Sequence, residues 1–199
     1  MAAAREDGTI SGAIWIRPGG AAAAELQAVI DELQQRCGGP GGTPHLALLS
    51  GIHTSAGDGQ RKLSRLATRV RPFEVELGDI DFGDDYYRCL YVRALPSREL
   101  EAARRAALEV FGAPMQAGDG WHVPLLYGEE SLDTRRALAR EFGSRVRRSF
   151  AVDSLELVNA ARGVPVSQWH GIARARLRDD AQRRQRTLGG VPYSQVGGG

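Results

Sequence analysis

Two short segments of this chain read almost alike, and each carries a histidine at its second residue. They are PHLALLSG, residues 44–51, and WHVPLLYG, residues 121–128. An apolar run that ends in glycine predicts a buried strand stopped by a turn. A histidine at the same place in two such strands indicates one site built from two halves of a duplicated fold. Two imidazoles that face one cleft can supply a general base and a general acid near neutral pH.

The spacing of the predicted strands supports an internal repeat. An aromatic residue on an earlier strand precedes each histidine at nearly the same distance, 30 residues from Trp15 to His45 and 31 from Tyr91 to His122. In both halves the next strand begins 28 residues after the histidine. Because the order of elements also matches, we interpret the chain as two copies of one unit.

The hydrophobic pattern predicts helices and strands in a repeating order. The predicted strands are 10–17, 45–50, 73–77, 86–93, 122–127, 150–158 and 169–177, and the predicted helices are 21–36, 60–68, 97–111 and 131–142. We expect an α+β fold with two similar β-α-β-α-β lobes, antiparallel sheets around a central cleft, and helices outside. Residues 10–178 would form this single bilobal domain, between a flexible N-terminus at 1–9 and a flexible tail at 179–199.

Composition excludes several classes of function. The formal net charge of +2 gives no strong steering toward nucleic acid. No apolar run approaches the length of a membrane span, and the first residues carry no secretory leader. Cys37 and Cys89, the two cysteines, have no metal-ligand spacing, and we expect reduced thiols, although a single bridge between them stays open. These features predict a cytoplasmic monomer without membrane contact, metal or other cofactor.

The two histidine segments resemble the motifs of the two-histidine (2H) phosphoesterase superfamily, and most closely its cyclic phosphodiesterase branch. The family motif is His-x-Thr/Ser-x, once per lobe. The run PHLALLSG resembles the first copy and HVPLLYG the second, including the tyrosine at Tyr127. The segment 86–91, Trp15 on the first predicted strand, and the late Trp169 also resemble this branch. The resemblance covers about residues 14–177.

The resemblance implies hydrolysis of a cyclic phosphodiester to a phosphomonoester without a metal. The expected substrates are nucleoside 2′,3′-cyclic phosphates, ADP-ribose 1″,2″-cyclic phosphate, or RNA ends that carry such groups. By this resemblance His45 and His122 are the catalytic acid and base, in an order that the sequence leaves open. Trp15 and Tyr127 would contact the substrate, either by stacking on a base or, equally, as packed core aromatics.

The chain departs from the family at the two hydroxyl positions. Residues two apart on a strand share a face, so the motif hydroxyl would lie beside each histidine. Ala47 and Pro124 occupy these two substrate-binding positions. A hydrogen bond to a charged group contributes about 1.5–3 kcal/mol. The absence of both hydroxyls therefore weakens phosphate binding strongly unless other groups replace them. Pro124 also implies that the second strand is bulged or that its donor side is free.

Three alternatives therefore stay open. The chain is a cyclic phosphodiesterase, or it is a weakened or inactive relative that binds nucleotide or serves as an interaction subunit, or it processes RNA 2′,3′ ends. Arg17, Arg88 and Arg93 are candidates to hold phosphate in place of the missing hydroxyls. Ser50 has the wrong strand parity to share a face with His45. His53 is expected after the strand, in a polar surface loop.

Overall fold

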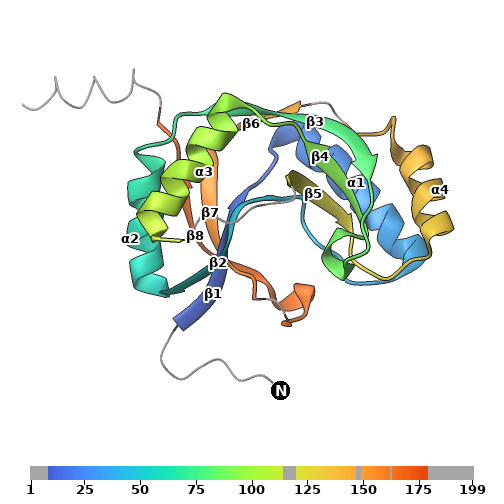
Figure 1. Ribbon diagram of the computed structural model, residues 1–199, viewed down its shortest axis with the longest axis horizontal. Helices are drawn as coiled ribbons and strands as arrows, with labels where there is room; N and C mark the ends of the chain where they lie inside the picture. The colour runs from blue at the N-terminus through green and yellow to red at the C-terminus, as the bar shows by residue number, and fades with distance from the viewer. Residues whose placement is uncertain (1–8, 114–119, 147–148, 162, 179–199) are drawn as a thin grey trace, which may run out of the picture.

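The computed structural model describes residues 9–113, 120–146, 149–161 and 163–178 (Figure 1). Of the predicted flexible segments, 1–9 and 179–199, residues 1–8 and 179–199 lie outside the described residues, and Thr9 is the first residue of a strand. The elements are, in chain order, β1 (Thr9–Ile16), α1 (Gly20–Cys37), β2 (Leu46–Ser55), α2 (Ala56–Ala67), β3 (Phe73–Asp81), η1 (Tyr86–Arg88), β4 (Leu90–Ala94), α3 (Arg98–Phe111), β5 (Trp121–Leu126), α4 (Leu132–Phe142), β6 (Ser149–Val152), β7 (Ser154–Asn159), η2 (Val166–Gln168) and β8 (His170–Arg176).

The strands form two four-stranded antiparallel sheets. The first has the order β2-β1-β7-β8 and the second the order β5-β4-β3-β6. Helices α2 and α3 pack on the first sheet, and α1 and α4 lie against the second, so the helices flank the outside of both sheets (Figure 1). This arrangement confirms the predicted α+β fold with two lobes and outer helices.

The two repeats exchange elements. Strand β3 comes from the first half of the chain but pairs with β4 and β6 in the second sheet. Strand β7 comes from the second half of the chain but pairs with β1 in the first sheet. Helices α1 and α3 likewise lie over β5 and β2, in the sheet of the opposite repeat. Each lobe is therefore assembled from both halves of the sequence, and neither repeat makes a complete sheet alone.

Two predicted strands are interrupted, each for a local reason, and two others, 45–50 and 73–77, extend further than predicted, to Ser55 and Asp81. The predicted strand 150–158 divides at Asp153, where the chain leaves one sheet for the other. The predicted strand 86–93 begins as the 3-10 helix η1, because the carboxylate of Asp85 accepts a hydrogen bond from the backbone N–H of Tyr87 at 2.7 Å. Such a cap satisfies an N–H that a strand would pair with a neighbour.

The helices follow the predicted stripes and caps. The stripe of α1, which comprises Leu26, Val29, Ile30 and Leu33, is buried. The hydroxyl of Ser97 accepts a hydrogen bond from the N–H of Leu100 at 3.1 Å at the start of α3, and Ser131 caps α4 in the same way. No helix in the described part of the chain is long and apolar enough to cross a membrane.

Candidate active site

The two histidine strands are both edge strands. Among the described strands, β2 pairs only with β1, and β5 pairs only with β4. These two edges approach each other and leave between them a cavity of about 700 Å³. Its wall includes all six predicted site residues, which are Trp15, His45, Ala47, His122, Pro124 and Tyr127. The tertiary structure thus brings together residues that are more than 100 positions apart in the chain.

The repeat is visible in the register beside each histidine. Trp15 pairs with Ala47 in the first sheet, and Tyr91 pairs with Pro124 in the second. The residue after Ala47 is Leu48, and the residue after Pro124 is Leu125. Each leucine falls in a register shift, so the two ladders are bulged at equivalent places. A bulged edge strand tolerates a residue without an N–H. The bulge expected beside Pro124 is therefore present.

His45 is held from two sides. Its Nδ1 lies 2.8 Å from the carbonyl oxygen of Thr43, which can only accept, so Nδ1 carries the proton. Its ring stacks on the indole of Trp15, with centroids 3.6 Å apart and planes 12° apart. Only 6% of its surface is exposed. The remaining nitrogen, Nε2, is therefore left with a lone pair in a fixed position.

Burial also sets the protonation state of His45. Loss of hydration lowers the pKa of His45 to about 4, the Thr43 hydrogen bond opposes that shift, and positive charge at Arg17 and His122 adds to it. The imidazole is consequently neutral at pH 7. Positive charge on His122 lowers the pKa of His45, which is consistent with both rings lining one cavity.

Tyr127 lies against Nε2 of His45. Its hydroxyl oxygen is 3.5 Å from Nε2, a long contact. Burial, with Tyr86 and Tyr87 nearby, raises the pKa of Tyr127, so the phenol keeps its proton. Tyr127 is thus a neutral donor beside the candidate base. With 5% and 6% exposed surface, Trp15 and Tyr127 are packed side chains that position His45.

His122 occupies the equivalent place in the second lobe. It belongs to β5, pairs with Arg93 of β4, and lines the cavity. Its ring centroid lies 5.0 Å from that of Tyr91, with planes at 58°. The aromatic neighbour that the spacing predicted is therefore present in both halves, although the second ring is tilted where the first is stacked. His122 is half-buried and more accessible than His45.

The burial of His45 predicts a pH-dependent stability. Unfolded histidine binds a proton below pH of about 6.5, whereas folded His45 does so only below about 4. Between these values the unfolded state holds more protons, so the free energy of unfolding falls as the pH drops, by at most about 3 kcal/mol. Urea unfolding at pH 6.5, 5.5 and 4.5 measures this slope. His45→Asn should flatten it and His170→Asn should not, and equal slopes in wild type and His45→Asn would contradict the assignment.

Two predictions about β2 are wrong because the strand is longer and bulged. A second register shift lies at Gly51, whose φ of 73° suits glycine. Each bulge reverses the alternation of faces, so Ser50 and His53 line the same cavity as His45. His53 lies within β2, not in a loop, and its Nδ1 is 3.2 Å from the hydroxyl of Ser11. Parity counted along an unbulged strand could not reveal this.

The three candidate arginines have different surroundings. Arg88 lines the histidine cavity. Arg17 binds Glu156 and Thr43 and lines a smaller neighbouring cavity of about 360 Å³. Arg93 forms an ion pair with Asp81 at 3.3 Å and lines a third cavity.

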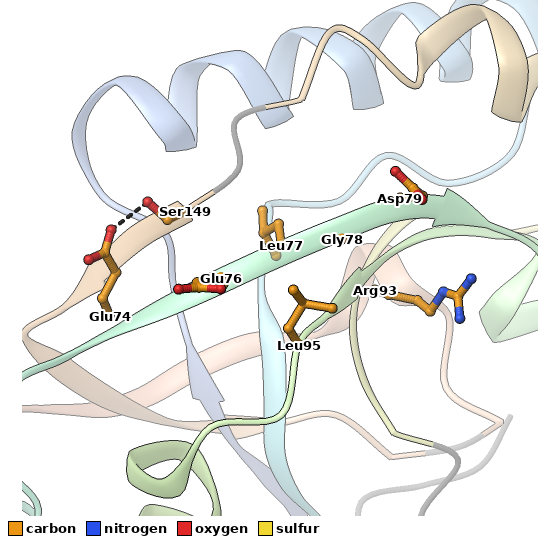
Figure 2. Close-up of a pocket in the computed structure, with 8 residues that line it drawn as sticks. All are labelled: Glu74, Glu76, Leu77, Gly78, Asp79, Arg93, Leu95 and Ser149. Carbon is orange, nitrogen blue, oxygen red and sulfur yellow. Dashed lines mark hydrogen bonds between the residues drawn. The ribbon is translucent and has the colours of Figure 1, made fainter.

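That third cavity lies on the second sheet and is acidic (Figure 2). It has a volume of about 690 Å³, and its charged lining residues are Glu74, Glu76, Asp79 and Arg93. Ser149 donates a hydrogen bond to Glu74 there. No histidine is among the described residues that line it. Its carboxylates repel a polyanion, so this surface does not suit the continuing strand of a long RNA.

The cysteines and acidic residues form no further site in the part of the chain that the structure describes. Cys37 and Cys89 are both free thiols, and burial raises the pKa of each. No group of three His, Cys, Asp or Glu side chains that could hold a metal ion occurs within the described ranges.

Sequence reasoning missed Tyr87 and Ser11 among the polar lining of the cavity. It named Arg88 as one of three candidate arginines but gave no means of choosing between them. Because η1 is helical, Tyr87 and Arg88 are consecutive yet both line the cavity, which neighbours on a strand do not. The motif Asp85-x-Tyr87, with a capping carboxylate, is the signal that could have indicated this turn.

Comparison with solved structures gives the same fold. E. coli LigT in its apo form superposes with a TM-score of 0.58 at 19% sequence identity, covering 87% of this chain and 100% of LigT. LigT in complex with 3′-AMP gives 0.54 at 19% identity, covering 85% and 99%. A further structure, described as a phosphoesterase, gives 0.52 at 19% identity over 85% and 99%. Scans against family models and against curated protein sequences find no match.

The chain therefore has the fold of the 2H phosphoesterases, as the resemblance of its histidine segments predicted. At 19% identity the likeness defines the fold, while the chemistry of the cavity depends on this chain's own residues.

Proposed function

We propose that this protein hydrolyses a small cyclic phosphodiester to a phosphomonoester, with His45 and His122 as the acid–base pair. The carrying observation is that one cavity is lined by both imidazoles, with His122 on the bulged edge strand β5 and His45 directly before the bulged edge strand β2. The likeness of the fold to LigT, one structure of which holds 3′-AMP, supports a nucleotide as the substrate. Nucleoside 2′,3′-cyclic phosphates and ADP-ribose 1″,2″-cyclic phosphate fit this description.

The surroundings of the histidines favour His45 as the base. It is neutral, its Nδ1–H is anchored on Thr43, and Nε2 carries the lone pair. In the proposed reaction Nε2 takes a proton from water as the water oxygen bonds to phosphorus. The bond from phosphorus to one ring oxygen breaks, and His122 gives that oxygen a proton. An anionic substrate beside His45 would raise its pKa toward a useful range.

A direct assay tests the proposal. Purified protein with EDTA should convert 2′,3′-cyclic nucleotides or ADP-ribose 1″,2″-cyclic phosphate to the monoester, as followed by phosphorus NMR. Absence of product with every cyclic phosphodiester at high enzyme concentration would overturn it.

The pH dependence of kcat/KM tests the protonation state of His45. Because kcat/KM reports the free enzyme, a His45 imidazole with a pKa of about 4 stays neutral from pH 7 to pH 5 and causes no loss of activity over this range. If His45 had an ordinary histidine pKa and had to be neutral for catalysis, kcat/KM would fall roughly 20- to 30-fold. A fall of that size in pH-jump assays, with the fold intact by circular dichroism, would contradict a neutral His45 base.

A binding protein without turnover is the second candidate, and Ala47 and Pro124 favour it. The two positions that would hold phosphoryl oxygens by hydroxyls carry none. This alternative predicts that a nucleoside monophosphate raises the melting temperature while no product forms. RNA end processing is less favoured, since the acidic cavity next to Arg93 opposes a long polyanion.

A further inference from the structure

The group that anchors His45 lies in a loop with no helix or strand of its own. The Thr43 carbonyl accepts the Nδ1–H of His45, and it belongs to the segment between α1 and β2. Four of the six residues from 38 to 43 are glycine, at 38, 39, 41 and 42. Glycine leaves the backbone more conformations than any other residue. Contacts from outside the loop must therefore fix this carbonyl, and Gln27 of α1 provides one, 3.1 Å from the carbonyl oxygen of Gly42.

Arg17 supplies the contact to Thr43 itself. It follows directly after β1, and its Nη1 donates a hydrogen bond to the side-chain hydroxyl of Thr43. Its Cζ lies 5.2 Å from the centre of the Trp15 ring. Thr43 holds His45 at Nδ1, and Trp15 holds it by stacking on the face of the ring. One guanidinium therefore contacts both residues that fix the imidazole.

Arg17 is itself held by the first sheet. Its Nε donates a hydrogen bond to a carboxylate oxygen of Glu156 on β7, the strand next to β1. A β-carbon at Gly171 of β8 would overlap this carboxylate, so the glycine leaves the space that Glu156 occupies. The side chains of Arg17 and Glu156 are only 27% and 16% exposed, and their ion pair is thus more shielded from water than an ordinary surface pair. The pair orients the guanidinium toward Thr43.

We propose that Arg17 is a positioning residue, which fixes the Thr43 carbonyl and Trp15 so that Nε2 of His45 faces the cavity as the base. The role of His45 in this inference rests on the proposed function. Arg17 lines the smaller neighbouring cavity and is absent from the described wall of the histidine cavity, so it acts through other side chains and not on substrate. An imidazole whose Nδ1–H is bonded to a carbonyl can accept a proton only at Nε2.

Thr43→Val tests the link without changing any charge. Valine keeps the shape and the backbone carbonyl but cannot accept the Arg17 hydrogen bond, and position 43 is exposed, so the fold tolerates it. Nitrogen NMR of the His45 side chain should show part of the population shifted from the Nδ1–H to the Nε2–H tautomer. In hydrolysis of a 2′,3′-cyclic nucleotide, kcat should fall about 10- to 100-fold with KM little changed, because neither Thr43 nor Arg17 is among the described residues that line the histidine cavity.

Arg17→Gln should act in the same way. Because both substitutions break one link, the double variant should lose little more than the larger single loss. Arg17→Lys should recover part of kcat, since an ammonium can still donate to Thr43. Arg69→Gln is the matched control, because it removes an arginine of another ion pair, with Glu109, that lies outside the histidine cavity. Circular dichroism melts confirm that each variant folds.

Two results overturn the inference. One is an unchanged His45 tautomer in Thr43→Val or, where the wild type turns substrate over, an unchanged kcat, since His45 would then need no such hold. The other is a rise in KM at constant kcat in Arg17→Gln, which would make Arg17 a substrate-binding residue. A tautomer shift in Thr43→Val, in a protein that hydrolyses no cyclic phosphodiester, overturns the proposed function and leaves the positioning of His45 by Arg17 standing.

Discussion

Alanine at His45 or at His122 is expected to lower kcat for cyclic phosphodiester hydrolysis by about 10²–10⁴-fold. Each imidazole moves one proton in the proposed step, and a positioned acid or base contributes a factor of that size. Both line the same cavity, with Nε2 of His45 held in place by the Thr43 carbonyl. Single-turnover assays on a 2′,3′-cyclic nucleotide measure the effect.

The double variant sharpens this expectation. Since the two histidines act on one transition state, His45→Ala with His122→Ala should cost much less than the product of the single losses. His170→Ala is the matched control, because that ring bonds the Gln168 carbonyl and does not line the cavity. Activity that survives both single substitutions would remove His45 and His122 from the catalytic role.

Trp15→Ala is expected to reduce the free energy of unfolding by about 3–5 kcal/mol, the usual cost of truncating a buried aromatic. Trp15 is 5% exposed and packs on His45, Val158 and Trp169. The substitution would also admit water beside His45 and so raise its pKa from about 4 toward 6.5. Urea unfolding and an NMR titration of the imidazole measure the two effects.

Trp15→Phe separates packing from stacking. It keeps an aromatic ring against His45 and should lose less stability, with a smaller rise in the His45 pKa. A loss below about 1 kcal/mol in Trp15→Ala would show that the surrounding residues close the space, contrary to the role argued for the stack.

Local pattern was enough to predict most elements and the pairing of the histidines. Helix stripes and caps depend on neighbours three or four residues away, so they can be predicted from the sequence. The stripe of α1 and the caps Ser97 and Ser131 are examples. The nearly equal spacing from Trp15 to His45 and from Tyr91 to His122 reflects a repeat that the register of both sheets reproduces. Ala47 and Pro124, the two predicted substrate-binding positions, line the cavity that contains the histidines.

Other features depended on contacts that sequence neighbours do not determine. The bulge at Gly51 changes which side chains of β2 face the cavity, and it brings in Ser50 and His53. The carboxylates that pair with Arg17 and Arg93, which are Glu156 and Asp81, come from other strands.

The amino-acid sequence by itself determined the repeated unit, its helices and strands, and the two histidines that belong together. Only the tertiary structure decided that the repeats exchange β3 and β7, that the histidines have unequal burial, and that Arg88 reaches their cavity. The physical reason is one of range. Periodicity and capping act over a few residues, whereas desolvation, ion pairing and strand exchange are set by groups far away in the chain.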